Sequence, residues 1–275
     1  MGILSVQSSV VHGHVGNSAA QFALNRLGHE VWALPTVLLS NHPGHGGFTG
    51  RVTPAEELAD LLGGIMARGF LDRAEAVLSG YLGSAANGVV LREGVARVKR
   101  ANPRAPWLLD PVMGDVHTGL YVKPELVPFF RAAAAEADIV TPNRFELGLL
   151  LDRPAPATKD ELKAAALALA GPRLVVITSA LIEAGRIATL LRSGNATWLA
   201  WTPLVERAPH GSGDLFAALF LAHLLQDEPL AALGRALASV ADILAASAGL
   251  KEMKLIELQD RLLAPQTRVE IEPLQ

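Results

Sequence analysis

Leu108-Leu109-Asp110-Pro111-Val112-Met113-Gly114-Asp115 begins as a buried strand and delivers an aspartate at the carboxyl end of that strand, where Pro111 stops further strand pairing. Similar apolar runs recur along the chain, with helix-length segments between most of them. They lie near residues 2–7, 31–37, 75–79, 106–109, 138–141 and 173–178. This rhythm predicts an α/β fold with a central, mostly parallel β-sheet that helices flank on both faces, and such sheets bind ligands beyond the carboxyl ends of their strands.

The remaining segments fit the same plan. Apolar stripes, caps and early acidic residues predict helices over about 16–27, 54–68, 85–101, 213–225 and 230–248. Two short β-rich runs, 186–192 and 196–201, flank Ser193-Gly194-Asn195 and predict an antiparallel hairpin at one edge of the sheet. No composition break marks a linker, so we expect one domain over residues 1–275.

Composition excludes several classes of protein. The chain has 275 residues, 50% of them hydrophobic and 19% charged, which excludes an unfolded or fibrous chain. A net charge of −3 gives no reason to expect nucleic acid or an anionic membrane surface as a partner. The absence of cysteine excludes disulfides and thiolate chemistry. The amino terminus resembles a strand rather than a signal peptide, and the apolar runs are too short to span a membrane, so we expect a cytoplasmic protein.

The strongest chemical motif is Gly211-Ser212-Gly213-Asp214, directly before an apolar helix. The common signatures of P-loops, dinucleotide sites, zinc proteases and serine hydrolases are absent. Small residues let backbone N–H groups approach an anion closely, and a helix amino terminus carries about half a positive charge. The alternative is that Asp214 only offsets the helix dipole while the glycines form a turn.

Two further carboxylates follow predicted strands. Asp110 ends one strand, and Glu146 follows Thr141-Pro142-Asn143 at the end of another. Either could be an ordinary structural acid, since an early acidic residue is common at a helix start. Together with an anion-binding helix start, however, they supply the parts that magnesium-assisted phosphoryl transfer needs.

Two polar loops, His12-Gly13-His14-Val15-Gly16-Asn17 and Ser40-Asn41-His42-Pro43-Gly44-His45-Gly46, hold four of the eight histidines. A zinc site is one interpretation, but neither loop contains an acidic residue to complete it. We therefore expect the wall of a polar pocket. Tyr81, in Ser79-Gly80-Tyr81-Leu82-Gly83-Ser84, is placed to lie against an aromatic ligand, although it could instead cap the core.

Taken together, these segments resemble the pyridoxal kinases of the ribokinase superfamily, in particular the bacterial branch, almost from end to end. The matching segments are Gln7-Ser8 with Gly13–Asn17, Ser40-Asn41-His42, residues 79–84, residues 110–115, Thr141-Pro142-Asn143-x-x-Glu146 and Gly211-x-Gly213-Asp214. The resemblance implies a ribokinase-like fold with a small lid, and a homodimer. It also implies ATP-dependent phosphorylation of the 5′-hydroxymethyl group of pyridoxal, with pyridoxine and pyridoxamine as further acceptors, assisted by Mg²⁺ and with room for a monovalent cation.

The resemblance also assigns roles to residues. Asp214 resembles the catalytic base, and the amides of Gly211, Ser212 and Gly213 resemble the anion hole beside the ATP phosphates. On the substrate side, the corresponding residues are Ser8, Pro43, Gly44, Tyr81 and Asp214 itself. On the ATP side, they are Asp110, Thr141, Glu146, Thr178 and Ser179, of which Asp110 and Glu146 face the magnesium ion.

The sequence also departs from the family at two places. Many members have threonine and tyrosine where this chain has Pro43 and His45, which bears on lid closure and substrate preference. One branch has a reactive cysteine near the position of Leu120, and that chemistry is absent here. Two alternatives stay open: a hydroxymethylpyrimidine kinase, although that group usually has cysteine in place of Asp214, and a catalytically silent B6-binding protein.

Overall fold

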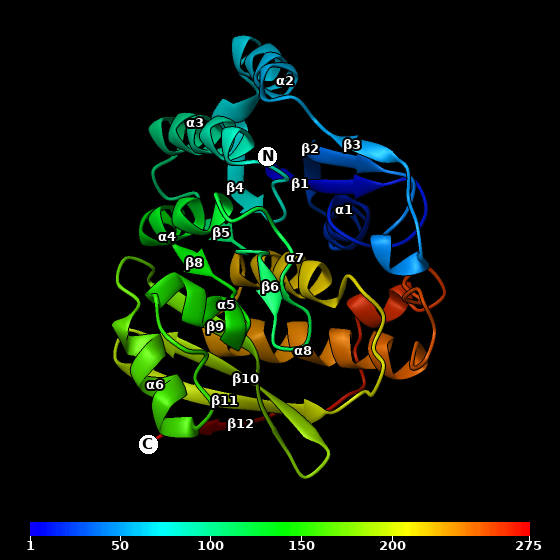
Figure 1. Cartoon of the computed structure of the whole chain (residues 1–275), viewed down its shortest axis with the longest axis vertical. Helices are drawn as coiled ribbons and strands as arrows, with labels where there is room; N and C mark the ends of the chain where they lie inside the picture. Colours follow the sequence, from blue (N-terminus) through cyan, green and yellow to red (C-terminus); the bar gives the residue numbers. More distant parts are fainter.

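A ten-stranded sheet runs through the centre of the molecule (Figure 1). The computed structural model describes all residues, 1–275. The strand order is β12-β11-β10-β9-β8-β5-β4-β1-β2-β3, and every pair from β9 to β2 is parallel. The main strands are β1 (Gly2–Val10), β2 (Glu30–Leu39), β3 (Gly50–Val52), β4 (Ala74–Ser79), β5 (Trp107–Leu109), β8 (Ile139–Val140), β9 (Leu174–Glu183), β10 (Arg186–Ser193), β11 (Ala196–Pro203) and β12 (Glu270–Pro273).

Helices cover both faces of this sheet. One face carries α1 (Asn17–Arg26), α7 (Ser212–Leu224) and α8 (Pro229–Ala246). The other carries α2 (Ala55–Ala67), α3 (Ala85–Ala101), α4 (Leu126–Glu136), α5 (Arg144–Leu151) and α6 (Lys159–Ala168). The predicted fold class is therefore confirmed, and the predicted helices agree with α1, α2, α3, α7 and α8 to within about two residues at most ends.

The two hydrophobic cores explain why the central strands are continuously apolar. Successive side chains of a strand point to opposite faces, so Ile3 joins the core under α1, α7 and α8 while Leu4 joins the core under α2 to α6. Both side chains are fully buried. A strand that is covered on both faces has no polar side, which is why these strands lack the alternation of a half-exposed sheet.

The carboxyl-terminal half of the sheet corrects one prediction. The hairpin around Ser193-Gly194-Asn195 is confirmed as β10 and β11, but it is not the edge of the sheet, because β12 pairs antiparallel with β11 beyond it. The strand β12 contains two glutamates and one proline in four residues, and it lacks the apolar pattern by which strands are recognised in a sequence. Its amide groups cover the edge that the hairpin would otherwise expose.

Helix α8 is long and apolar enough, by composition, to cross a membrane, and α7 is a shorter apolar helix. Half of the α8 window is buried within the protein, where it packs on α7, β10 and β11. This is the environment of the core helix that the sequence predicted, although its apolar stretch is longer than expected from the sequence.

Small elements outside the main sheet shape its carboxyl edge. Strand β3 returns antiparallel to β2, and the loop between them contains a 3₁₀ turn, η1 (Pro43–His45). We refer to this 3₁₀ turn and its N-cap His42 as the lid turn, because it lies where the resemblance implies a small lid. Strands β6 (Gly114–Asp115) and β7 (Gly119–Leu120) form a separate two-stranded hairpin between β5 and α4, and the sequence did not predict it.

Candidate active site

The predicted site residues lie along one edge of the sheet, because parallel strands present their carboxyl ends on the same side. Asp110 follows β5 and Thr141 follows β8, whereas Thr178 lies within the neighbouring strand β9, where it pairs with Asn143 just beyond β8. The other group lies on β1, β2 and β4: Ser8 near the end of β1, the lid turn with Pro43 and Gly44 after β2, and Tyr81 after β4. The amino terminus of α7 meets the edge between them. The strand order thus separates the expected ATP residues from the expected substrate residues.

Glu146 is held firmly at the start of α5. Asn143 and Glu146 form a capping box, in which each side chain accepts a hydrogen bond from the other's backbone N–H. The second carboxylate oxygen of Glu146 accepts from the Met113 N–H at 2.8 Å, while the Asn143 amide donates to the Gly114 carbonyl at 2.8 Å. These bonds join the segment after β5 to the segment after β8 and bury Glu146.

Asp110 lies next to this pair and next to α7. Its Oδ1 accepts a hydrogen bond from the Thr141 hydroxyl at 3.0 Å. A Cβ atom placed on Gly213 would lie 4.0 Å from the other oxygen of Asp110. The end of β5 and the first turn of α7 therefore face each other at close range.

Asp214, in the first turn of α7, is linked to the substrate side of the site. The Gly16 backbone N–H lies near its carboxylate and favours the ionised form. Gly16 in turn fits closely against Ser8, since a Cβ on Gly16 would lie 2.5 Å from the Ser8 hydroxyl oxygen. The structure therefore brings Ser8, Gly16 and Asp214 together although the sequence separates them by up to 206 residues.

All three carboxyl groups are costly to ionise, and Asp110 is affected by the charges of the other two. Burial raises the pKa of Asp110 well above its usual range, and the charges of Glu146 and Asp214 add to the rise. Burial likewise raises the pKa of Glu146 to about 7 and that of Asp214 to about 6, although backbone N–H groups oppose both shifts. Such a group of mutually repelling acids is typical of a functional site that receives a cation or moves a proton.

The amino terminus of α7 is open to an anion. No side chain caps the helix, so the first amides lack partners within it. Gly211 precedes them with a φ of 93°, and a Cβ there would lie 2.0 Å from the His14 carbonyl oxygen. Only glycine satisfies both the left-handed backbone and this close approach. The close backbone turn that precedes Asp214 therefore requires glycine at position 211.

The remaining predicted residues lie around this centre. The Thr178 N–H donates to the Pro142 carbonyl at 2.9 Å, and Ser179 follows with a left-handed φ of 48°. Tyr81 is half-buried beside β2, where its carbonyl accepts from the Thr36 hydroxyl at 2.5 Å, and burial raises the pKa of its phenol. Tyr81 thus lies just beyond the carboxyl end of β4, and Thr178 and Ser179 lie within β9 beside the segment that follows β8.

Comparison with known proteins places the chain in a family. A family model described as phosphomethylpyrimidine kinase matches residues 71–255. The pyridoxal kinase PdxY of Corynebacterium diphtheriae is 40% identical over all of both chains, and that of Rubrobacter xylanophilus is 44% identical over 98% of this chain and 96% of its own. The chain belongs to the pyridoxal kinase family. The family prediction made from the sequence is confirmed, and the chain is an enzyme of this family.

Solved pyridoxal kinases share the whole fold. The enzyme of Leishmania donovani, solved in complex with ADP and pyridoxamine, superposes with a TM-score of 0.94 at 31% identity over 100% of this chain and 99% of its own. A putative phosphomethylpyrimidine kinase of Bacteroides thetaiotaomicron superposes with a TM-score of 0.91 at 27% identity over 99% and 97%. The folds of pyridoxal kinases and phosphomethylpyrimidine kinases are therefore closely related. The two relatives above with 40% and 44% identity to this chain are pyridoxal kinases.

Three residues near the site of this pyridoxal kinase carried no sequence signal. Tyr121 follows the β6–β7 hairpin, and partial burial together with the carboxylates of Glu146, Asp110 and Asp214 raises the pKa of its phenol. His210 stacks on His42 of the lid turn, with ring centroids 4.0 Å apart. The third is Glu252, which reaches the two histidine-containing loops from the carboxyl-terminal segment. No local pattern distinguishes these three from ordinary surface residues.

Glu252 also corrects the view of the histidine loops as lacking an acid. Its carboxylate pairs with the His45 ring at 2.6 Å and accepts a hydrogen bond from the backbone N–H of His14 at 3.0 Å. Even so, no group of three or more His, Asp or Glu side chains is arranged to hold a metal ion by itself. The pairing instead joins the lid turn to the rest of the site.

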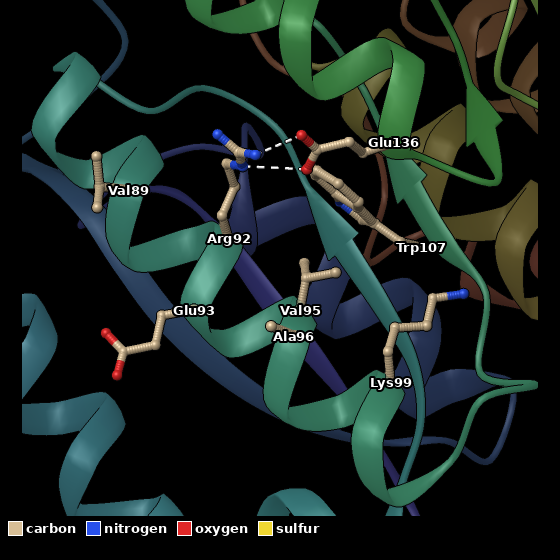
Figure 2. A pocket seen from close by; sticks show the side chains of 8 residues that line it. All are labelled: Val89, Arg92, Glu93, Val95, Ala96, Lys99, Trp107 and Glu136. Carbon is tan, nitrogen blue, oxygen red and sulfur yellow. Dashed lines mark hydrogen bonds and ion pairs between the residues drawn. The ribbon is translucent and has the colours of Figure 1, made fainter.

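A separate hollow lies outside the site. Figure 2 shows side chains of α3 around it, with Arg92 paired to Glu136 of α4 and Trp107 beside Glu136. None of the predicted site residues lines this hollow, and its ion pair is exposed to solvent. We therefore assign it no part in the candidate active site.

Proposed function

We propose that this chain transfers the γ-phosphoryl group of ATP to the 5′-hydroxyl of pyridoxal, and that it also accepts pyridoxine and pyridoxamine. The names of the curated relatives, and the complexes of the Leishmania donovani kinase with ADP and either pyridoxine or pyridoxamine, support this activity. The observation that carries the proposal is the position of Asp214 in the first turn of α7. It lies there beside uncapped amides and within the electrostatic reach of Asp110.

In this mechanism, Asp214 takes the proton of the 5′-hydroxyl as that oxygen attacks the γ-phosphorus. A general base works best when its pKa lies near the working pH, and burial raises the pKa of Asp214 to about 6. At neutral pH the carboxylate is therefore ionised but more basic than an exposed aspartate. The Gly16 N–H keeps it oriented toward the substrate side.

The amides of Gly211, Ser212 and Gly213 would stabilise the negative charge that spreads over the transferring phosphoryl oxygens. They are preorganised, because the left-handed Gly211 and the start of α7 already point them to one place. The dipole of the 13-residue helix α7 adds to this stabilisation. This arrangement needs no rearrangement of the backbone during the reaction.

Asp110 and Glu146 are the residues that would hold Mg²⁺ with the ATP phosphates. The fit rests on charge: burial raises the pKa of both carboxyl groups, the charge of Glu146 raises that of Asp110 further, and a nearby cation would relieve both shifts. Magnesium commonly keeps several waters and binds through only one or two carboxylates plus phosphates, which agrees with the lack of a complete protein cage. When bound, the ion would neutralise charge on the β- and γ-phosphates.

The other predicted residues fit around these groups. Ser8 is close to Gly16, and thus to the base, as expected for a residue that hydrogen-bonds the pyridine ring. Tyr81 offers an aromatic face to that ring, and the lid turn with Pro43 and Gly44 would cover it. Thr141, Thr178 and Ser179 are neutral donors on the ATP side. A monovalent cation near the phosphates remains part of the expectation.

Hydroxymethylpyrimidine is the second candidate acceptor, which the description of the matching family model favours. Asp214 favours pyridoxal as the acceptor, because hydroxymethylpyrimidine kinases usually have cysteine at this position. A silent B6-binding protein is a weaker alternative, since Asp214, Asp110 and Glu146 are all present.

We further propose that residues 1–275 act as a single kinase domain and that the enzyme works as a cytoplasmic homodimer. One continuous sheet that includes both ends of the chain supports the first point. The resemblance to the family supports the second. Sedimentation at micromolar concentration would test it, because a monomer would contradict it.

A panel of acceptors tests the proposed activity. Purified protein is incubated with ATP and Mg²⁺ and separately with pyridoxal, pyridoxine, pyridoxamine and hydroxymethylpyrimidine, and the products are followed by mass, with Asp214→Asn alongside. We expect pyridoxal 5′-phosphate from the wild type and none from the variant. Product only from hydroxymethylpyrimidine would establish the alternative acceptor, and tight binding of pyridoxal without product would indicate a silent binding protein.

A further inference from the structure

Glu252 connects two loops that serve different parts of the site. One oxygen pairs with the His45 ring in the lid turn at 2.6 Å, and the other accepts from the His14 N–H at 3.0 Å. His14 lies in the loop between β1 and α1, and its carbonyl oxygen lies against Gly211 at the start of α7, the helix that carries Asp214. Two residues later in the same loop, the Gly16 backbone N–H favours the ionised form of Asp214. One carboxylate thus ties the lid to the loop that holds the proposed base.

The segment that carries Glu252 is firmly anchored. Met253 is buried, and its methyl group would lie 3.0 Å from a Cβ on Gly211. The Lys254 N–H donates at 2.9 Å to the Ser247 hydroxyl, which itself donates at 2.6 Å to the Ile243 carbonyl in α8. The fixed end of α8 therefore determines where the Glu252 carboxylate sits.

The lid turn itself has few other attachments. Pro43 and Gly44 are exposed, whereas the His45 and Glu252 side chains are only 21% and 25% exposed. The other attachments of the turn's rings are the stacking of His42 on His210 and an edge contact between His12 and His45 with centroids 5.9 Å apart. A partly buried, charge-assisted hydrogen bond is stronger than these contacts.

We propose that Glu252 is a positioning residue that fastens the lid turn, through His45, onto the loop that orients Asp214. The inference rests on the proposed function, because the lid turn is expected to cover the pyridoxal-type acceptor. Glu252 acts on acceptor capture through His45 and on the alignment of the base through His14.

This division predicts different kinetic effects for two variants. His45→Ala releases only the lid, so the KM for pyridoxal rises about tenfold while kcat stays within about twofold. Glu252→Ala releases both loops, so the same KM rises about tenfold and kcat falls about tenfold as well. The KM for ATP stays within about twofold in both, because the ATP residues lie on the other side of α7.

Three further variants sharpen the test. The double variant His45→Ala with Glu252→Ala has the same KM for pyridoxal as Glu252→Ala alone. Once Glu252 is replaced, the loss of His45 has no further effect on this KM, because His45 acts through Glu252. Glu252→Gln restores most of kcat, because its amide oxygen still accepts from the His14 N–H. Glu257→Ala, which removes an exposed acid from the same segment, is the matched control and behaves as the wild type.

Hydrogen exchange gives a readout that is independent of turnover. In the folded variants His45→Ala and Glu252→Ala, the amides of residues 40–49 exchange faster than in the wild type, while Glu257→Ala leaves them unchanged. Unchanged exchange and unchanged KM for pyridoxal would overturn the inference, as would single effects that multiply in the double variant. A wild type that phosphorylates no B6 vitamer would instead refute the proposed function, so the two failures are distinguishable.

Discussion

Replacing Asp214 by asparagine should remove activity and yet make the protein more stable. The carboxyl group has a pKa of about 6 in the folded protein against 3.8 for an ordinary aspartate. Because this pKa is raised, the folded state binds more protons than the unfolded state at pH values between 3.8 and about 6, and the free energy of unfolding falls as the pH rises through this range. A shift of about two pKa units means that the ionised carboxylate destabilises the folded protein by about 3 kcal/mol at pH 8.

Asparagine keeps an oxygen for the Gly16 N–H but never ionises, so Asp214→Asn should raise the free energy of unfolding by up to about 3 kcal/mol at pH 8. At pH 5 the gain should shrink to about half of that, because the wild-type carboxyl is then mostly protonated in the folded state. Urea denaturation at both pH values measures the difference. A variant that is less stable than the wild type at pH 8 would mean that the folded protein stabilises the carboxylate, which contradicts the reasoning.

Three other predictions concern the same site. Gly211→Ala should lower kcat about 100-fold, because its Cβ would meet the His14 carbonyl oxygen and displace an anion-binding amide. Gly63→Ala on α2, which has open space around it, is the control and should leave kcat unchanged. Equal activity of the two variants would contradict this prediction. The kcat/KM for pyridoxal should fall about tenfold per pH unit below about 6 as Asp214 is protonated, and a rate that rises on acidification would exclude this base. Glu146→Gln keeps only one of the two oxygens that accept hydrogen bonds from backbone N–H groups. In steady-state assays its KM for ATP should therefore rise about tenfold, while its KM for pyridoxal stays unchanged. The reverse pattern would place Glu146 on the acceptor side.

The sequence predicts the central sheet and most of the site because both depend on local patterns. Buried parallel strands are recognisable as short apolar runs, and a polar residue that directly follows such a run lies at the carboxyl edge. Asp110 and Thr141 were placed in this way, and the structure joins them by a hydrogen bond of 3.0 Å. The capping box around Glu146 is equally local, since its two members are three residues apart.

Contacts between distant segments could not be predicted in this way. His45 and Glu252 are 207 residues apart, and neither has a pattern that indicates its partner. Strand β12 was missed for a related reason: it is short and polar, and its pairing is determined by the free edge of β11 rather than by its own residues. Close backbone approaches, such as Gly211 against the His14 carbonyl, likewise become visible only when the loops are placed in space.

The most direct test of the central claim is a single-turnover measurement of phosphoryl transfer from ATP to pyridoxal by the wild type and by Asp214→Asn, with pyridoxal affinity measured alongside. We predict that the wild type forms pyridoxal 5′-phosphate and that the variant does so at least about 100-fold more slowly while it binds pyridoxal with similar affinity. Transfer by the variant within about tenfold of the wild-type rate would contradict the assignment of Asp214 as the base.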